Sequence, residues 1–121
     1  MKKRVLICGS RDWTRKNIIE RELNKLEPSK TLIIHGGARG VDRLAGKLAK
    51  ERGIEVIVFP AEWDKYGKAA GMIRNQQMLK EGKPDLVLAF SENIEYSKGT
   101  KNMRDISEDA GVEVRVISEW E

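Results

Sequence analysis

Four short stretches of this 121-residue chain carry residue types that bind anions or hold a proton. They are Gly9-Ser10-Arg11-Asp12, Gly36-Gly37-Ala38-Arg39-Gly40-Val41-Asp42, Arg74-Asn75 and Ser97-Lys98-Gly99-Thr100. A glycine turn that leads into a helix exposes backbone N–H groups at the positive end of the helix dipole. Arginine binds phosphate or carboxylate through two parallel hydrogen bonds. Together these types indicate a site for an anionic ligand.

Each stretch also has a purely structural interpretation. Residues 36–42 match neither a Walker A loop nor G-x-G-x-x-G, so Gly36 and Gly37 equally fit a tight strand-to-helix turn, with Asp42 favoured by the helix dipole. Residues 97–100 equally fit an ordinary helix N-cap. Asp12 could cap the next helix, and the Arg74-Asn75 pair could lie on a solvated helix face.

Aromatic residues lie beside two of these stretches. Trp13 either faces the ligand edge or packs into the core. Trp63 and Tyr66, in a long loop expected at 60–71, could stack on a base or sugar, or form a hydrophobic lid or dimer contact.

The candidates for catalysis are few. Asp12 and Asp42, assisted by Arg74, could serve a glycosidic reaction. The single histidine, His35, has no evident nucleophile beside it, and the single cysteine, Cys8, fits a small core residue. One histidine and one cysteine form no metal-ligand spacing, so no metal, cofactor or disulfide is predicted.

Charge and hydropathy narrow the class of protein. The 23 Lys and Arg residues exceed the 19 Asp and Glu residues by four, but they are spread along the chain. This pattern suits an anionic small molecule more than a nucleic-acid arm. The apolar run near the N-terminus is too short for a signal peptide or a membrane span, so we expect a cytoplasmic protein without a membrane partner.

Apolar runs and helical patterns alternate along the chain. The expected strands are Arg4–Cys8, Thr31–His35, Glu55–Phe59, Asp85–Phe90 and Glu113–Ile117. The expected helices are Arg15–Leu26, Ala38–Arg52, Ala70–Lys80 and Thr100–Ala110. This alternation predicts one α/β domain over residues 1–121, with a parallel sheet between two layers of helices. The strand-to-helix loops, which carry the unusual residues, then lie at the carboxyl edge of the sheet.

Taken together, the motifs resemble a known family. Gly-Ser-Arg-Asp-Trp after the first strand, His-Gly-Gly-Ala-Arg-Gly-Val-Asp after the second, the stretch from Phe59 to Asn75, and Gly99-Thr100 are similar to the short YspA-like members of the SLOG superfamily, found in bacteria and phages. That superfamily includes the "lonely guy" phosphoribohydrolases and the Rossmann domain of the DNA-processing protein A. The resemblance implies a Rossmann-like three-layer sandwich with strand order 3-2-1-4-5 and a pocket for a nucleotide or nucleotide-derived ligand.

The resemblance also implies where the ligand binds. The loops at 9–12 and 97–100 would form opposite walls, with 35–42 beside the first, and Arg74 would take the place of a catalytic arginine. The predicted ligand-binding residues are Gly9, Ser10, Arg11, Asp12, Gly36, Gly37, Ala38, Gly40, Asp42, Arg74, Asn75, Ser97, Lys98, Gly99 and Thr100.

One departure decides between binding and catalysis. The hydrolases carry Pro-Gly-Gly-x-Gly-Thr-x-x-Glu, whereas here Glu95, Tyr96 and Ser97 precede Lys98, and Met103 stands in place of the catalytic glutamate. We therefore expect a sensor or sequestering module, not an enzyme. The alternatives are a nucleotide N-glycosidase or phosphoribohydrolase with displaced carboxylates and, third, a single-stranded DNA-binding protein. The resemblance also implies a homodimer or larger homo-oligomer, with the aromatic loop as a candidate interface.

Overall fold

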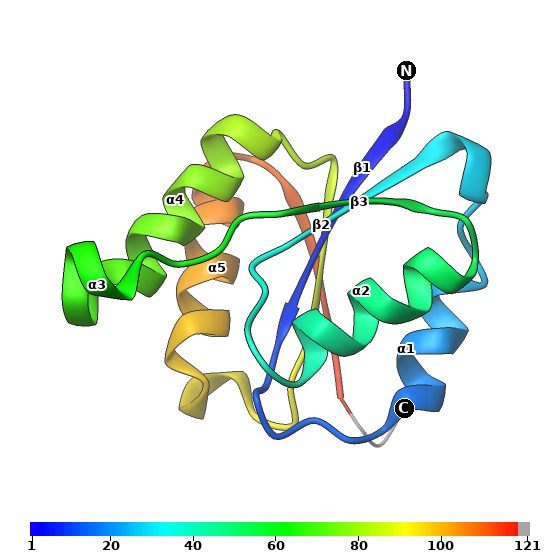
Figure 1. Cartoon of the computed structure of the whole chain (residues 1–121). Helices are drawn as coiled ribbons and strands as arrows, with labels where there is room; N and C mark the ends of the chain where they lie inside the picture. The colour runs from blue at the N-terminus through cyan, green and yellow to red at the C-terminus, as the bar shows by residue number, and fades with distance from the viewer. Residues whose placement is uncertain (119–121) are drawn as a thin grey trace.

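A five-stranded parallel sheet forms the centre of the computed structural model, which describes residues 1–118 (Figure 1). Its strands are β1 (Lys3–Gly9), β2 (Thr31–His35), β3 (Glu55–Val58), β4 (Leu86–Phe90) and β5 (Glu113–Ile117). They pair in the order β3-β2-β1-β4-β5, and every pair is parallel. This confirms the Rossmann-like fold and the predicted strand order.

Two layers of helices cover the sheet, one on each face. Helices α1 (Lys16–Leu23) and α2 (Val41–Glu51) contribute to one hydrophobic cluster, and α4 (Ala70–Gly82) and α5 (Lys98–Asp109) contribute to the other (Figure 1). Successive strand residues alternate between the clusters: Leu88 and Phe90 face the first, whereas Val87 and Ala89 face the second. Burial on both faces explains why the strands read as continuous apolar runs.

Trp13 belongs to the core. Its ring packs edge-on against Phe90 with centroids 5.7 Å apart, and its indole Nε1 donates to the carbonyl of Arg15 at 2.9 Å. Neither Asp12 nor Thr14 caps helix α1, whose N-cap residue is Arg15 with no side-chain cap bond. The sequence placed Trp13 either at the ligand edge or in the core, and its burial shows that it packs into the core.

Four predicted helix boundaries were wrong by two or three residues, one of them the end of α4, which continues past Lys80 to Gly82. The helix expected at 38 begins at Val41, because Gly40 has φ +80° and the Val41 N–H bonds to the carbonyl of Ser10 at 3.2 Å. The helix expected to reach Leu26 ends at Leu23, since residues 24–26 form tight turns. The helix expected at Thr100 already begins at 98.

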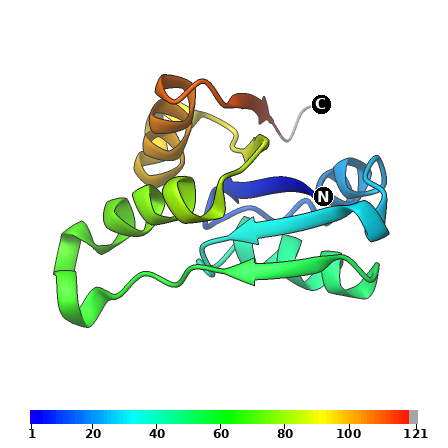
Figure 2. The ribbon, with the colours of Figure 1, turned by 90° about the horizontal axis from the view of Figure 1, so that it is seen from above.

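The long loop expected at 60–71 is partly helical, which corrects the sequence interpretation. It contains helix α3 (Trp63–Tyr66) and the 3-10 turn η2 (Gly67–Ala69), which lead directly into α4. Seen from above, this segment projects away from the sheet beyond β3 (Figure 2). Few apolar residues fall at regular spacing in it, so periodicity could not reveal such short helices.

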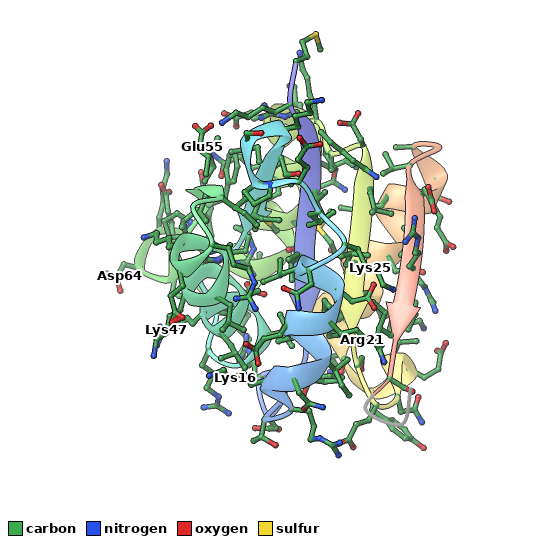
Figure 3. All side chains as sticks on the ribbon, turned by 90° about the vertical axis from the view of Figure 1, so that its right-hand side faces the viewer. Lys16, Arg21, Lys25, Lys47, Glu55 and Asp64 are labelled. Atoms are coloured by element: carbon green, nitrogen blue, oxygen red, sulfur yellow. The ribbon has the colours of Figure 1, made fainter. Side chains whose placement is uncertain are left out.

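Basic side chains are spread over the face formed by α1 and α2. Lys16, Arg21 and Lys25 lie on or just after α1, and Lys47 lies on α2; all four are exposed (Figure 3). Part of the excess of basic over acidic residues therefore lies on a face exposed to solvent. No helix within residues 1–118 is long and apolar enough to cross a membrane.

Candidate functional site

A cleft of about 450 Å³ opens at the carboxyl edge of the sheet, where the strand order reverses between β1 and β4. It is lined by Cys8, Gly9, Arg11, Asp12, Ala38, Asp42, Arg74, Asn75, Met78, Tyr96, Ser97, Lys98, Gly99 and Thr100. The loops after β1, β2 and β4 all contribute, as the topology requires. The structure thus brings most of the predicted site residues together in one place.

Four predicted residues do not line this cleft. Ser10 instead accepts a hydrogen bond from the Asp12 N–H through its Oγ at 3.1 Å. Gly40 packs against the backbone of Ser10 and Arg11, so close that a Cβ there would overlap both. Gly36 and Gly37 line an adjoining hollow.

Cys8, Met78 and Tyr96 line the cleft although the sequence did not indicate them as ligand-binding residues. Each has a neighbour that did: Cys8 precedes Gly9, Tyr96 precedes Ser97, and Met78 follows Arg74 by one helical turn. The sequence signal that could have indicated these three residues was therefore their position next to, or one helical turn from, a predicted site residue. Burial, followed by the charge of Asp42, raises the pKa of the Cys8 thiol, so this cysteine is not a reactive nucleophile.

The N-terminus of α5 forms one wall of the cleft. Ser97, its N-cap residue, makes no side-chain capping bond; its Oγ instead lies 3.1 Å from the Oγ of Ser91. The N–H groups of the first turn, at Lys98, Gly99 and Thr100, are therefore not capped by this side chain. A helix end of this kind favours negative charge.

Asn75 joins α4 to this wall. It is 3% exposed, and its side-chain amide donates to the carbonyl of Gly99 at 3.1 Å and to Oδ1 of Asn102 at 3.0 Å. Its own Oδ1 accepts a bond from Nε of Arg74 at 3.1 Å. Asn75 is therefore fully engaged within the chain and positions both Arg74 and the first turn of α5.

Arg74 reaches from α4 to the loop after β2. Its Nη1 donates to the carbonyl of Gly36 at 2.6 Å, and the guanidinium lies where a Cβ on residue 36 would be. Only glycine leaves that space, so the close approach that Gly36 permits is to Arg74. Burial lowers the pKa of Arg74, but an arginine keeps its charge at neutral pH.

Asp42 holds the loop between β2 and α2 in place. Its Oδ2 accepts the backbone N–H of Gly36 at 3.1 Å and that of Ala38 at 3.2 Å. The third amide, that of Gly37, donates to Nδ1 of His35 at 2.9 Å. The amides of Gly36, Gly37 and Ala38 are thus used inside the chain and are not offered to a phosphate.

Burial also sets the protonation of Asp42. It raises the pKa of this carboxyl to about 6, against the opposing effect of its backbone bonds and of Arg74 and Arg11. Asp42 thus changes charge close to neutral pH. Asp12, by contrast, has an 88% exposed side chain, 3.7 Å from Arg39. The two candidate carboxylates stand in very different environments.

His35 lies at the buried end of β2. Its Nδ1 accepts the Gly37 N–H, and burial lowers its pKa to about 4, with further lowering by Lys50 and Arg74. A neutral, bonded imidazole at a strand end is structural, which agrees with the sequence interpretation. Within residues 1–118, no three His, Cys, Asp or Glu side chains are grouped as metal ligands would be.

Comparison with known proteins identifies the family. The family model described as "YspA, cpYpsA-related SLOG family" matches residues 3–66. The Gene 61 protein of Mycobacterium phage D29 is 35% identical to this chain, over 93% of this chain and 94% of the relative. The chain belongs to the YspA-related SLOG family. The resemblance seen in its motifs is thereby confirmed.

A solved SLOG structure has the same fold. The X-ray structure of DNA processing protein A (DprA) from Streptococcus pneumoniae matches with a TM-score of 0.77 at 20% identity. The match covers 95% of this chain and 50% of the DprA chain, so this chain spans about half of that protein. At this identity the likeness is one of fold.

The motif resemblance implies that Met103 takes the place of the glutamate of the phosphoribohydrolases. Its side chain is fully buried in the cluster with Leu6, Met78 and Val87, on the sheet side of α5. It does not line the cleft. In this SLOG chain the position therefore contributes to packing.

Proposed function

We propose that this SLOG chain binds a nucleotide or nucleotide-derived ligand in the cleft between β1 and β4, and acts as a sensor or sequestering module. The observation that carries the proposal is the uncapped N-terminus of α5 in the same cleft as Arg11 and Arg74. A helix end and two guanidinium groups together favour a phosphate.

The carboxylates of the cleft support binding over turnover. Hydrolysis of an N-glycosidic bond requires a carboxylate that stabilises the sugar cation or activates water. Asp42 uses Oδ2 to hold the loop after β2, Asp12 is exposed beside Arg39, and Met103 is buried where a glutamate would act. A ligand bound here would be retained unchanged.

A nucleotide- or DNA-related role also agrees with the comparisons. The chain belongs to the YspA-related SLOG family, and its fold matches a protein named for DNA processing. Both comparisons point to nucleotides and nucleic acids as ligands, and the cleft supports the smaller of these, the nucleotides.

The test is a thermal-shift screen with mononucleotides, cyclic nucleotides and ADP-ribose derivatives. We expect at least one compound to raise the melting temperature. Gly99→Asp should abolish the shift, because it adds a negative charge to the first turn of α5. A side chain there meets nothing within 4 Å, and an acid at a helix N-terminus does not weaken the helix.

Gly99→Ala is the matched control. It fills the same open space without charge, so it should keep the ligand-induced shift. Arg74→Ala should abolish the shift as well, at a cost in stability, because it leaves the Gly36 carbonyl without this donor. A flat response of the wild-type protein across the whole panel would contradict the proposed function.

The hydrolase is the second candidate, and the raised pKa of Asp42 favours it. A carboxyl that titrates near pH 6 could act as a general acid towards a leaving base. Incubation with AMP at high protein concentration, followed by chromatography, would detect free adenine. Release that Asp42→Asn abolishes would establish the hydrolase; no release would remove this activity on AMP.

Single-stranded DNA is the third candidate. Arg39 and Arg43 lie beside the cleft, and Trp63 offers an exposed ring for stacking. Binding to an oligonucleotide should then fall steeply with salt and tolerate changes of sequence. Lys16, Arg21, Lys25 and Lys47 are not among the residues that line the cleft, which weakens this alternative.

A further inference from the structure

A second hollow adjoins the cleft at the carboxyl edge. It measures about 440 Å³ and is lined by Arg11, Gly36, Gly37, Ala38, Arg39, Arg43, Pro60, Ala61, Trp63 and Arg74. Arg11, Ala38 and Arg74 line both spaces, so the two hollows meet at a ridge formed by these residues. A ligand that crosses the ridge would contact both guanidinium groups.

The second hollow is more strongly cationic than the first. Four arginines line it, and no acidic residue is among its lining within residues 1–118, whereas Asp12 and Asp42 partly offset the basic residues of the first cleft. Arg43 uses Nε for the carbonyl of Gly37 at 3.0 Å, which leaves four N–H donors of that guanidinium outside this bond. Arg39 makes one long contact with Asp12, at 3.7 Å.

An exposed aromatic ring lines each of the two hollows. Tyr96 lines the first cleft and is 86% exposed, and Trp63 lines the second hollow and is 50% exposed. Trp63 lies on α3, in the segment that projects beyond β3 (Figure 2). An exposed ring beside guanidinium groups is a common platform for a nucleobase. Each hollow therefore has one exposed ring among its lining, and the two hollows share Arg11 and Arg74.

We propose that the ligand is a dinucleotide, two nucleosides joined through phosphate. One nucleoside occupies the first cleft beside Tyr96, the linking phosphates lie on the ridge of Arg11 and Arg74, and the second nucleoside stacks on Trp63 with Arg39 and Arg43 beside its phosphate. This inference rests on the proposed function and specifies its ligand. A mononucleotide leaves the more cationic hollow empty.

Titration calorimetry with AMP, diadenosine pyrophosphate and the oligonucleotide dT12 tests the proposal. We expect diadenosine pyrophosphate to bind about tenfold or more tightly than AMP, the gain typical of one added base–aromatic stack. Trp63→Ala should reduce its affinity to that of AMP and leave the affinity for AMP unchanged.

Tyr66→Ala is the control. Tyr66 is an exposed aromatic on the same short helix, but it lines a different hollow, so its removal should not affect either affinity. Equal affinity for AMP and diadenosine pyrophosphate would overturn the dinucleotide proposal and leave the proposed function in place. Tighter binding of dT12 than of diadenosine pyrophosphate, with a steep salt dependence, would show that the ligand is a DNA strand and not a dinucleotide. Failure of all three ligands to bind would reject the dinucleotide, and a flat response in the thermal-shift screen as well would reject nucleotide binding in the cleft.

Discussion

At the scale of single residues, Asp42 shows how a side chain can complete a turn and occupy the groups a ligand would use. Its carboxylate takes the amides of Gly36 and Ala38, so the turn is stabilised from within. The sequence indicated that Asp42 either is favoured by the helix dipole or takes part in the ligand site. Only the structure shows that Oδ2 of Asp42 accepts bonds from the turn. A glycine can adopt many backbone conformations, so the sequence does not determine where its N–H group points.

Asp42 should make stability depend on pH. Its pKa is raised from 3.8 to about 6 on folding, so its contribution to stability is present below pH 3.8 and is lost as the pH rises through about 6. Relative to Asp42→Asn, the wild-type protein should lose up to about 3 kcal/mol between those values. Urea unfolding of both proteins across this range measures the difference.

Comparison of the two proteins removes the effect of His35. Its lowered pKa, about 4, acts in the opposite direction, since stability from this residue is lost as the pH falls below 6.5. That contribution is present in both proteins and cancels. A difference that stays constant with pH would contradict the raised pKa of Asp42.

Gly40 should tolerate substitution less well than Gly53. Both have positive φ, +80° and +73°, but a Cβ on Gly40 overlaps the backbone of Ser10 and Arg11, whereas one on Gly53 meets nothing within 4 Å. Gly53→Ala should cost about 1 kcal/mol of unfolding free energy from backbone strain alone. Gly40→Ala should cost clearly more, measured by urea denaturation. Equal losses would show that the two loops can move apart without penalty.

At the scale of elements, Asn75 connects the two helices on one face of the sheet. Asn75→Ala should destabilise the protein by about 1–2 kcal/mol, because it removes two hydrogen bonds that this buried side chain donates to α5. It should also weaken ligand binding, since the first turn of α5 loses its support. Thermal unfolding with and without ligand measures both effects.

Asn24→Ala is the comparison for Asn75. Asn24 also accepts a bond, from Nε of Arg52 at 3.1 Å, but it lies at an exposed position. Its loss should cost about 0.5 kcal/mol or less. Similar costs at the two positions would mean that Asn75 does not hold α5.

The elements themselves were largely predictable. The strands at 31–35 and 113–117 match the predicted bounds, β3 and β4 differ by one residue at one end, and β1 extends one residue further at each end. Short β-branched runs between turn residues leave few alternatives. Helix α3 was missed, since four residues carry no periodicity. The start of α2 was wrong because a tertiary contact, the Val41 N–H on Ser10, decides it.

At the scale of the whole molecule, topology explains why the cleft was predictable and the second hollow was not. In a parallel sheet of this order, the loops after β1 and β4 must lie on either side of the switch point. The second hollow depends instead on how α3 lies relative to Arg39 and Arg43. The position of α3 relative to these arginines follows from how α4 packs, and residue spacing in the sequence does not predict that packing.

The oligomeric state remains a prediction. Tyr66, Met72 and Ile73 are exposed on the segment formed by α3 and the start of α4, which agrees with the aromatic loop as a candidate interface. We expect light scattering to show at least a dimer and Met72→Glu to yield a monomer, because a charge in an apolar contact is costly. A wild-type monomer at high concentration would exclude this interface.

The burial of Met103 limits how this chain could evolve. A glutamate introduced there would enter the apolar cluster between α5 and the sheet as an unpaired charge, at a cost of several kcal/mol. A single codon change towards the hydrolase motif would therefore lower the population of folded protein before it supplied any catalysis. The packing of α5 against the sheet therefore opposes the acquisition of a carboxylate at position 103.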